Sequence, residues 1–356
     1  MTIDLIAGAR PNFVKLAALF HSIKKYDFIK YRIIHTGQHY DKIMSDVFFD
    51  ELEIPLPDVN LEVGSSTDIE QTANIMIKYD HLLNNTYKPD KIIVVGDVNS
   101  TLACSLVSAK SGIQLIHVEA GIRSYDNKMP EEINRIITDS ISNHFFTTTK
   151  NAKNILLSEG KKENKIHFVG NVMIDTLLRN KNKFKIPEIF NSLELNQNKY
   201  SVITIHRPSN VNNKNFWIKL FDTLNKHENI LFVFPCHPRT NKVLNQHKIP
   251  NNLKLITPLS YLEFNFLVSK SGLIITDSGG VTEEATVLEI PCITLRKNTE
   301  RPETVEIGTN ELIGNDFKLL NKLINKAFSN NWKSTKIPEL WDGETAERIV
   351  KILSKI

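Results

Sequence analysis

Acidic side chains gather between residues 117 and 135, where the chain should pass from a strand into a helix. Glu119 directly follows an apolar run of strand length, and Glu131 follows a proline of the kind that the first turn of a helix tolerates. Two arginines, among them Arg135, lie in the same stretch, whereas Glu132 is expected to be a structural charge at the helix start. Carboxylates and cations at the carboxyl end of a strand indicate proton transfer on an anionic substrate.

A further carboxylate, Asp97, follows the most apolar run of the chain, residues 92–95. By itself Asp97 could simply cap the helix that should begin near Ser100. In a parallel sheet, however, it would lie beside Glu119 at the tip of a neighbouring strand. Two carboxylates so placed repel each other, so one should keep its proton near neutral pH, and an acid and a base could then coexist.

A strand and a helix in the second half of the chain should be joined through Ser278, Gly279 and Gly280. Backbone amides at such a helix start can approach a phosphate closely, and the helix dipole favours its negative charge. Ser278 could instead be an ordinary N-cap of the helix. The phosphate interpretation is favoured by Glu284, which could accept both hydroxyls of a ribose, and by Arg301.

The loop after the first expected strand, residues 8–15, lacks both the glycine fingerprint of dinucleotide sites and the Gly-Lys-Ser/Thr ending of a P-loop. Neither NAD nor ATP is therefore indicated. Arg10 and Lys15 could instead place two cations beside a leaving diphosphate, although Lys15 alone could equally be a surface charge. Histidine spacing typical of a metal site is absent from the sequence, so no metal is expected.

Two histidines, His206 and His237, end expected strands in the second half of the chain, and Arg207 follows the first of them. Either histidine could be a satisfied structural group. Because all three residues follow strands, as the acidic residues do, they are also candidates for the functional site.

Short apolar runs alternate with helical patterns along the chain, which predicts parallel sheets with helices on both faces. A chain of 356 residues fits two domains, so we expect two Rossmann-like, doubly wound α/β domains facing across a cleft. The expected domains are residues 1–175 together with a final helix over 344–356, and residues 176–343. The strands are expected at residues 3–7, 31–36, 91–96, 114–118, 145–149, 166–169, 201–205, 230–235, 253–256, 273–276 and 292–295.

Composition narrows the classes of partner. The net charge is only +4 and the lysines are scattered along the sequence, so nucleic-acid binding is not indicated. The sequence has no signal peptide and no run of about 18 apolar residues, so no membrane association is expected. Cys104, Cys236 and Cys292 are odd in number and far apart, which favours a reducing cytoplasm over a disulfide framework.

A series of short motifs, each weak alone, runs in a fixed order from Gly8 to about Gly308. The motifs are Gly-Ala-Arg-Pro-x-x-x-Lys, Gly-Asp-x-x-Ser-Thr-Leu-Ala, His-Val-Glu-Ala-Gly-x-Arg, Pro-Glu-Glu-x-Asn-Arg, Gly-Asn-x-x-Ile-Asp, His-Arg, Thr-Asp-Ser-Gly-Gly-x-x-Glu-Glu-Ala and Glu-Arg-Pro-Glu. Together they resemble the motifs of the non-hydrolysing UDP-N-acetylglucosamine 2-epimerase family. The set is specific and spans nearly the whole chain.

This resemblance implies the GT-B fold, in which two Rossmann-like domains enclose the active site and a C-terminal helix packs back on the first domain. It also implies a cytoplasmic homodimer that needs neither NAD nor metal. The implied reaction inverts C2 of a UDP-2-acetamido sugar, as in UDP-GlcNAc to UDP-ManNAc, for surface polysaccharide precursors. The C2 proton is removed as UDP leaves C1, which gives a glycal with a double bond between C1 and C2. UDP then adds back as C2 is protonated from the other face.

By the same resemblance, the catalytic residues are Asp97, Glu119, Glu131, Lys15 and His206. Which carboxylate serves which face of the sugar stays open. The residues expected to bind the substrate are Arg10, Arg135, Arg207, His237, Phe264 at the uracil, Ser278, Gly279, Gly280, Glu284 at the ribose, and Arg301.

The chain departs from the usual family sequence at Ala9 and Asn12, where a hydroxyl and a carboxylate are missing. We hypothesise that the site therefore accepts an anionic sugar, such as a UDP-2,3-diacetamido glucuronic acid. The segment Gln38–Asp41 also differs from the family segment linked to activation by a second substrate molecule, so such activation is not expected.

Three other functions are compatible with parts of this pattern. A retaining GT-B glycosyltransferase shares the fold and the UDP-sugar site but needs an acceptor instead of a base for C2, and three carboxylates in the first domain speak against it. A hydrolysing epimerase would release free N-acetylmannosamine and UDP. A nucleotide-sugar sensor would bind the ligand without exchanging a proton.

Overall fold

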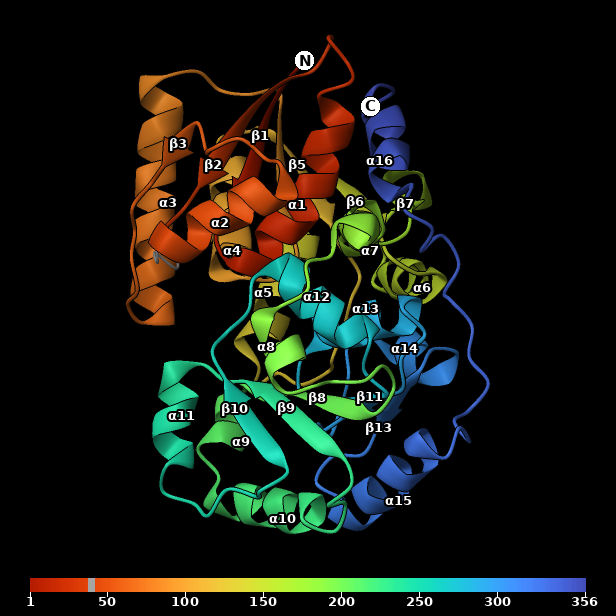
Figure 1. Cartoon of the computed structure of the whole chain (residues 1–356). Helices are drawn as coiled ribbons and strands as arrows, with labels where there is room; N and C mark the ends of the chain where they lie inside the picture. The colour runs from red at the N-terminus through yellow and green to blue at the C-terminus, as the bar shows by residue number, and fades with distance from the viewer. Residues whose placement is uncertain (38–41) are drawn as a thin grey trace. The chain divides into compact units, whose positions relative to one another are not determined.

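The computed structural model of the protein describes residues 1–37 and 42–356 (Figure 1). The chain forms two compact units, unit 1 from Met1–Arg179 with Glu339–Ile356, and unit 2 from Asn180–Pro338. The expected boundary after residue 175 lies inside helix α7 (Val172–Asn180), whose residues up to Leu177 are buried. The helix therefore stays with unit 1 for almost its whole length.

Unit 1 is built on a sheet of parallel strands in the order β3-β2-β1-β4-β5-β6-β7. The strands are β1 (Thr2–Ala7), β2 (Lys30–His35), β3 (Val59–Asn60), β4 (Lys91–Val95), β5 (Gln114–Val118), β6 (His144–Thr147) and β7 (Ile166–Phe168). All five residues of β4 are buried, as expected for a parallel strand covered on both faces. The strand order reverses between β1 and β4, and such a reversal is where doubly wound sheets bind ligands.

Most helices of unit 1 connect successive strands, and two follow the last strand. They are α1 (Arg10–Ile23), α2 (Lys42–Leu52), α3 (Asp68–Asn85), α4 (Asn99–Lys110), α5 (Pro130–Ile141), α6 (Lys150–Ser158), α7 and α16 (Thr345–Leu353), with a short 3-10 helix at Glu163–Lys165. As expected, Pro130 stands in the first turn of α5, where no intrahelical partner for its missing N–H is needed. Helix α1 also has a proline, Pro11, in its first turn, and Asn12 there accepts the N–H of Ala9 at 3.1 Å and donates to the carbonyl oxygen of Val95 at 2.9 Å.

The C-terminal segment returns to unit 1, where α16 packs against α1 (Figure 1). The carboxylate of Asp175 accepts the N–H of Ala346 at 2.6 Å, and the indole of Trp341 donates to the carbonyl oxygen of Thr148 at 3.1 Å. Gly170 has a φ of +101°, and a Cβ there would lie 2.1 Å from the carbonyl oxygen of Leu340. The Gly-Asn-x-x-Ile-Asp motif therefore forms the surface on which the returning segment docks.

Unit 2 repeats the architecture with the strand order β10-β9-β8-β11-β12-β13, again all parallel. The strands are β8 (Tyr200–Thr204), β9 (Leu231–Pro235), β10 (Leu253–Ile256), β11 (Leu273–Thr276), β12 (Cys292–Thr294) and β13 (Asn310–Leu312). The helices are α8 (Glu188–Ser192), α9 (Pro208–Val211), α10 (Lys214–Leu224), α11 (Pro238–Leu244), α12 (Tyr261–Ser269), α13 (Gly279–Val287), α14 (Pro302–Glu306) and α15 (Phe317–Phe328), with a 3-10 helix at Lys181–Lys183. The order reverses between β8 and β11.

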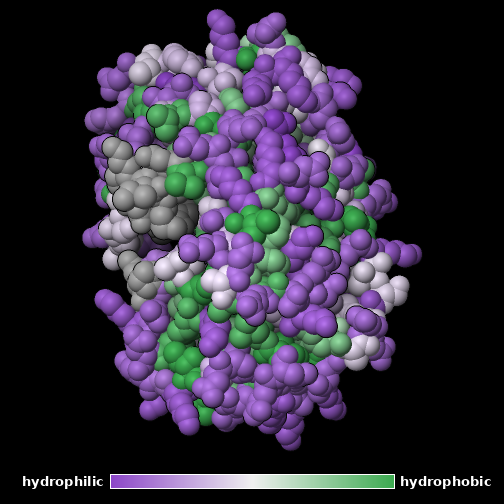
Figure 2. Space-filling view, viewed as in Figure 1, coloured by the Kyte–Doolittle hydropathy of each residue, from purple (hydrophilic) through white to green (hydrophobic). Residues whose placement is uncertain are grey.

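Figure 2 shows hydrophilic residues over most of one face of the molecule, with hydrophobic ones between them. Within residues 1–37 and 42–356, no helix has both the length and the apolar character that crossing a membrane requires.

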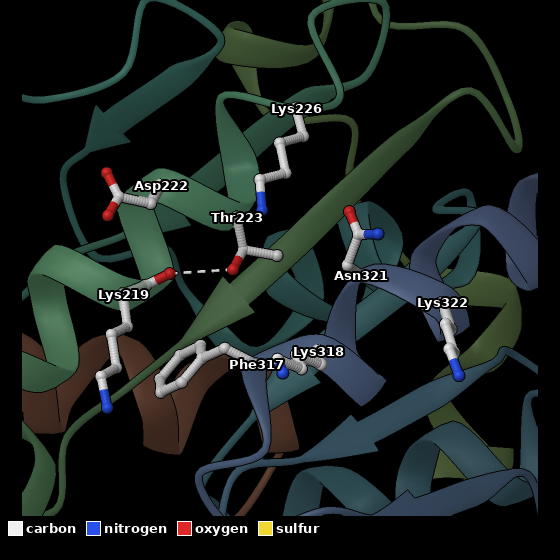
Figure 3. A pocket seen from close by; sticks show the side chains of 8 residues that line it. All are labelled: Lys219, Asp222, Thr223, Lys226, Phe317, Lys318, Asn321 and Lys322. Atoms are coloured by element: carbon white, nitrogen blue, oxygen red, sulfur yellow. Dashed lines mark hydrogen bonds between the residues drawn. The ribbon is translucent and has the colours of Figure 1, made fainter.

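The scattered lysines of the sequence do gather at one place on unit 2. A pocket of about 440 Å³ lies between α10 and α15 (Figure 3). Its lining includes Lys219 of α10, Lys226 just after that helix, and Lys318 and Lys322 of α15, with Asp222 among them. None of the residues expected at the functional site lines this pocket.

Candidate active site

The side chains of Lys15 and Glu119 form a buried ion pair in unit 1. Lys15 lies on α1, which follows β1, and Glu119 follows β5. The Lys15 Nζ is 2.6 Å from Glu119 Oε2, and the two side chains are 9% and 2% exposed. Lys15 is therefore not a surface charge, because it neutralises a carboxylate that the fold has removed from water.

The backbone around this pair is held in an unusual conformation. Glu119 has a φ of +72°, in the left-handed region that residues with a Cβ seldom adopt, and its N–H donates to the carbonyl oxygen of Phe146 at 3.0 Å. Gly96, at the end of β4, also has a φ of +72°. A Cβ on Gly96 would lie 3.1 Å from the Lys15 Nζ and 3.6 Å from Glu119 Oε2. Strained residues of this kind concentrate at functional sites.

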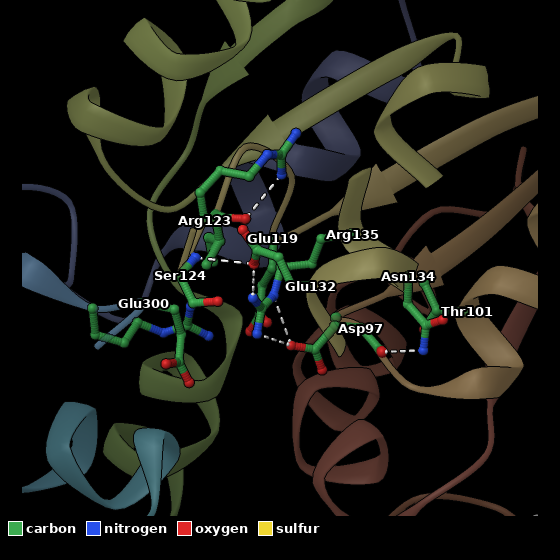
Figure 4. A network of polar contacts seen from close by, with 12 residues as sticks. Asp97, Thr101, Glu119, Arg123, Ser124, Glu132, Asn134, Arg135 and Glu300 are labelled. Carbon is green, nitrogen blue, oxygen red and sulfur yellow. Dashed lines mark hydrogen bonds and ion pairs between the residues drawn. The ribbon is translucent and has the colours of Figure 1, made fainter. Parts of the chain in front are cut away.

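Asp97 is paired with Arg135 of α5 (Figure 4). The Nε and Nη2 atoms of Arg135 lie 2.9 Å and 2.8 Å from Asp97 Oδ2, and the Nδ2 of Asn134 donates to the Asp97 carbonyl oxygen at 2.8 Å. The side chain of Asp97 is 28% exposed, whereas that of Arg135 is 3% exposed. Arg135, which was expected to bind substrate, thus holds Asp97 in place with a guanidinium that is almost fully buried.

The expectation that one carboxylate keeps its proton rested on repulsion between two carboxylates without cations beside them. Glu119 has the Lys15 ammonium beside it, and Asp97 has the Arg135 guanidinium. The two cations offset the repulsion between carboxylates on which that expectation depended.

Glu132 is a fully buried carboxylate on α5. It accepts the backbone N–H groups of Ser124 and Tyr125, each at 2.9 Å, and it also pairs with Arg135 (Figure 4). It therefore fixes the loop that follows β5. Glu131, in the first turn of α5, is half-buried and forms none of these ion pairs.

In unit 2, Asp277 organises the ends of β8 and β11. It is fully buried, accepts the backbone N–H groups of His206 at 3.1 Å and Arg207 at 3.0 Å, and lies 2.9 Å from His206 Nδ1. Burial alone would raise the pKa of Asp277, but the hydrogen bonds from His206 and Arg207 hold it below its ordinary value. The His206 side chain stays 61% exposed. Asp277 therefore fixes the ring of His206 through Nδ1.

Asp277 was not among the expected site residues, although it follows β11 directly in the Thr-Asp-Ser-Gly-Gly motif. That position after a buried strand is the signal that could have identified it. Arg207 is partly structural, because its Nε donates to the carbonyl oxygen of Asp277 at 3.1 Å. His237 follows β9 and is exposed.

The helix start after β11 has the form expected of an anion site. Ser278 stands at the N-cap position of α13, but its side chain forms no capping hydrogen bond. Ser278, Gly279 and Gly280 are partly exposed, and the first amides of a helix have no intrahelical partner. A Cβ on Gly279 would lie 2.7 Å from Glu300 Oε1, so a larger residue would crowd this turn. The structure thus gives no capping role to Ser278 that would compete with a phosphate.

Two further expected site residues of unit 2, Arg301 and Phe264, are buried or partly buried. Arg301 is buried, and its Nε lies 2.5 Å from Oε1 of Glu283, a fully buried residue that was not among the expected site residues. Phe264 on α12 is partly buried and packs against the core cluster that contains Tyr200.

Arg10 is the first residue of α1, and its side chain lies outside the described part of the structure. The segment Gln38–Asp41 also lies outside the described residues.

Glu284 is a buried carboxyl group on α13. Burial raises its pKa to about 7, although hydrogen bonds from Tyr261 and Asn265 oppose this rise. The hydroxyl of Tyr261 donates to Glu284 Oε1 at 3.1 Å. Near neutral pH this group is therefore poised between its neutral and charged forms.

The raised pKa gives a testable pH dependence of stability. The folded protein binds the Glu284 proton more tightly than the unfolded chain, whose ordinary value is 4.5. The stabilisation of the folded protein by this proton is complete below about pH 4.5 and is lost as the pH rises to about 7. The total loss is at most roughly 3 kcal/mol. Glu284→Gln should therefore unfold at higher urea concentration than the wild type at pH 8, and this gain should shrink towards pH 5. Equal urea midpoints for the wild type and Glu284→Gln at both pH values would contradict the prediction. Glu306→Gln, on the exposed end of α14, is the matched control.

Comparison with known proteins agrees with this architecture. Two parallel-sheet α/β units with charged residues at their strand tips define the chain as a GT-B-type protein, as does its similarity to solved structures. The crystal structure of Methanocaldococcus jannaschii UDP-GlcNAc 2-epimerase in complex with UDP-GlcNAc and UDP matches with a TM-score of 0.90 and 41% identity, over 100% of both chains. The expected fold class is confirmed.

A profile of the UDP-N-acetylglucosamine 2-epimerase family matches residues 21–354. The UDP-N-acetylglucosamine 2-epimerase of M. jannaschii is 43% identical, over 99% of this chain and 99% of that protein. The UDP-2,3-diacetamido-2,3-dideoxy-D-glucuronate 2-epimerase of Pseudomonas aeruginosa is 37% identical, over 88% of each. The chain therefore belongs to the UDP-N-acetylglucosamine 2-epimerase family, a family of isomerases, and the expected resemblance is confirmed.

Proposed function

We propose that this protein is a non-hydrolysing epimerase that inverts C2 of a UDP-2-acetamido sugar and interconverts UDP-N-acetylglucosamine and UDP-N-acetylmannosamine. One observation carries the proposal. Asp97 and Glu119 follow the adjacent strands β4 and β5, and each carboxylate has its own cation. The M. jannaschii relative, whose crystal structure contains UDP-GlcNAc and UDP, supports this choice of substrate.

In the proposed reaction, one carboxylate takes the C2 proton, the C–H electron pair forms the C1=C2 double bond, and UDP leaves C1 with the electrons of the C1–O bond. UDP then adds back to C1 while a carboxyl group on the other face protonates C2. Each turnover exchanges the protonation states of the base and the acid, so the end of the forward reaction is the start of the reverse one. The catalytic carboxylates are Asp97, Glu119 and Glu131.

The departing diphosphate drives this elimination, because no carbonyl group acidifies the C2 proton. We propose that the amides at the start of α13 and the exposed ring of His206 stabilise the charge that develops on UDP. The ring is suited to this because Asp277 orients it through Nδ1. Glu284, with its hydroxyl donor Tyr261, is the proposed ribose contact.

Proton exchange tests the proposal directly. The protein is incubated with UDP-N-acetylglucosamine in heavy water, and the products are followed by proton NMR. Deuterium should appear at C2 in a sugar that is still attached to UDP. Release of a free sugar would indicate a hydrolysing enzyme, and absence of C2 exchange with every UDP-2-acetamido sugar would refute the proposal.

A second substrate, a UDP-2,3-diacetamido glucuronate, is suggested by the P. aeruginosa relative. The structure weakens the argument from Asn12, because its buried amide is engaged by the backbone of Ala9 and Val95. A donor to the Val95 carbonyl oxygen is a role that a glutamate could not fill. Side-by-side kinetics on both sugars decide between them, and faster turnover of the diacetamido glucuronate would favour the second.

The wider setting is part of the same proposal. We propose that the protein acts in the cytoplasm as a homodimer and supplies precursors for a surface polysaccharide, without NAD or a metal. The family resemblance supports this setting, and the sequence lacks the nucleotide fingerprints of NAD- and ATP-binding loops.

A further inference from the structure

The carboxylate of Glu300 lies at the start of helix α13. Glu300 belongs to the loop between β12 and α14, yet its Oε1 would be 2.7 Å from a Cβ on Gly279, the first residue of α13. The Glu300 side chain is 8% exposed. Negative charge is favoured at this end of a helix, where the first amides have no intrahelical partner. Glu300 therefore lies at the place where the proposed function expects a phosphate group.

Two arginines of the same unit face this carboxylate. Arg296 Nη2 lies 2.7 Å from Glu300 Oε2, and Arg207 Nη2 lies 3.9 Å from Glu300 Oε1. The side chain of Arg296 is 4% exposed, whereas that of Arg207 is 26% exposed. A buried cation without an anion beside it is strongly destabilising. In the ligand-free protein, Glu300 supplies that anion to Arg296.

Glu300 does not use all the donors of this guanidinium. The Nη1 atom of Arg296 is buried and has no hydrogen-bond partner within residues 1–37 and 42–356. It would lie 3.9 Å from a Cβ on Gly279, so it faces the start of α13. A buried donor without an acceptor is unfavourable. A diphosphate at the helix start would offer several charged oxygen atoms, which suit the planar fork of a guanidinium.

A diphosphate and Glu300 cannot share the start of α13. The space in front of Gly279 is filled by the carboxylate, and two negative groups so close together repel each other. We infer that Glu300 is a stand-in for the diphosphate of UDP. It neutralises Arg296 in the ligand-free protein and moves away when UDP binds, so that Arg296 becomes a further phosphate-binding residue. This inference rests on the proposed function, which takes the start of α13 as the diphosphate site.

The exchange of one anion for another lowers the affinity for UDP. The apparent affinity of a site falls with the fraction of molecules in which the site is open, and Glu300 keeps that fraction small. In return, Arg296 is not left without a counterion when UDP dissociates. The exchange also favours ligands with two or more negative charges, because a single charge gains little by replacing a carboxylate that is already in place.

Glu300→Gln tests the competition. Glutamine has the shape of glutamate and keeps an oxygen that can accept from Arg296, but it carries no charge to oppose a diphosphate. We expect the affinities for UDP and for inorganic pyrophosphate, measured by calorimetry on the whole protein, to rise on the order of tenfold. Glu306→Gln, on the exposed end of α14, is the matched control and should bind as the wild type does. Unchanged or weaker binding in Glu300→Gln would overturn the inference.

A second variant keeps the test decisive if Glu300→Gln does not fold. Glu300→Asp retains the charge for Arg296 but shortens the side chain by one methylene, which draws the carboxylate back from the start of α13. Its affinity for pyrophosphate should also rise, by less than in Glu300→Gln. Melting temperatures show whether each variant is folded, and a folded Glu300→Asp with unchanged or weaker binding would also contradict the competition.

The role of Arg296 is tested against the Glu300→Gln background, because Arg296→Gln alone would leave a buried carboxylate without its cation. The double variant Arg296→Gln, Glu300→Gln should bind UDP on the order of tenfold more weakly than Glu300→Gln, since it lacks charge-assisted hydrogen bonds to the diphosphate. Equal affinities would remove Arg296 from the site. In crystals grown with UDP, the Glu300 carboxylate should have left Gly279, and a carboxylate still in place beside a bound diphosphate would refute the exchange.

These measurements do not depend on turnover, so failure of the inference and failure of the proposed function are distinguishable. Tighter UDP binding in Glu300→Gln, in a protein that exchanges no C2 proton, would leave the role of Glu300 standing and reject the epimerase reaction. Exchange at C2 in the wild type, with no gain of UDP affinity in Glu300→Gln, would give the opposite result.

Discussion

Glu119→Gln is expected to lower the rate of C2 proton exchange by about 10²- to 10⁴-fold while leaving UDP affinity nearly unchanged. Glutamine has the shape of glutamate, so the packing around this buried side chain is kept, but an amide cannot take up a proton at neutral pH. The Lys15 ammonium can still donate to the amide oxygen. The exchange rate in heavy water and the calorimetric affinity for UDP measure the two effects separately.

Asp97→Asn and Glu131→Gln should behave in the same way, because the three carboxylates act on the sugar and not on UDP. Glu163→Gln is a suitable control, since Glu163 pairs with Lys153 at an exposed site away from the strand tips. Wild-type exchange in Glu119→Gln would exclude this residue from the chemistry. Unfolding of all three variants would indicate that the carboxylates are needed for structure instead.

Lys15→Met is expected to destabilise the protein by about 3–5 kcal/mol, since it removes the cation from a pair whose carboxylate stays buried. Methionine keeps most of the length and apolar volume of lysine, so the loss of stability reflects the missing charge more than a change in packing. Urea unfolding at neutral pH measures the change.

The matched experiment adds Glu119→Gln to the Lys15→Met chain. The double variant should recover most of the lost stability, because no buried charge then lacks its counterion, and the double-mutant cycle gives the coupling between the two side chains. Additive losses in the two single variants would show that the ion pair contributes little and would remove the physical reason given for the burial of Lys15.

The sheet architecture could be predicted from the sequence because strands buried on both faces are continuous apolar runs. The runs at residues 91–96 and 273–276 became β4 and β11 nearly as expected. Strands β3 and β13 were missed. They have two and three residues, lie at sheet edges, and include polar residues, so neither their length nor their periodicity distinguishes them from loops.

Candidate residues at strand tips could also be predicted, because parallel strands bring their carboxyl ends to one edge. The partners of those residues could not. Lys15 is 104 residues from Glu119, and Arg135 is 38 residues from Asp97, so no local spacing indicates either pair. The sequence therefore suggested that one of Asp97 and Glu119 would hold its proton, whereas the fold supplies a separate cation to each.

Unit 1 consists of two stretches of sequence that the whole of unit 2 separates. The second stretch, with the buried Trp341 and helix α16, leaves the ribosome only after residues 180–338 have been made. During synthesis, unit 2 can thus acquire all of its strands while unit 1 still exposes the apolar surface that α16 covers. Translation that stops within unit 2 leaves a first unit that is incomplete and prone to aggregate.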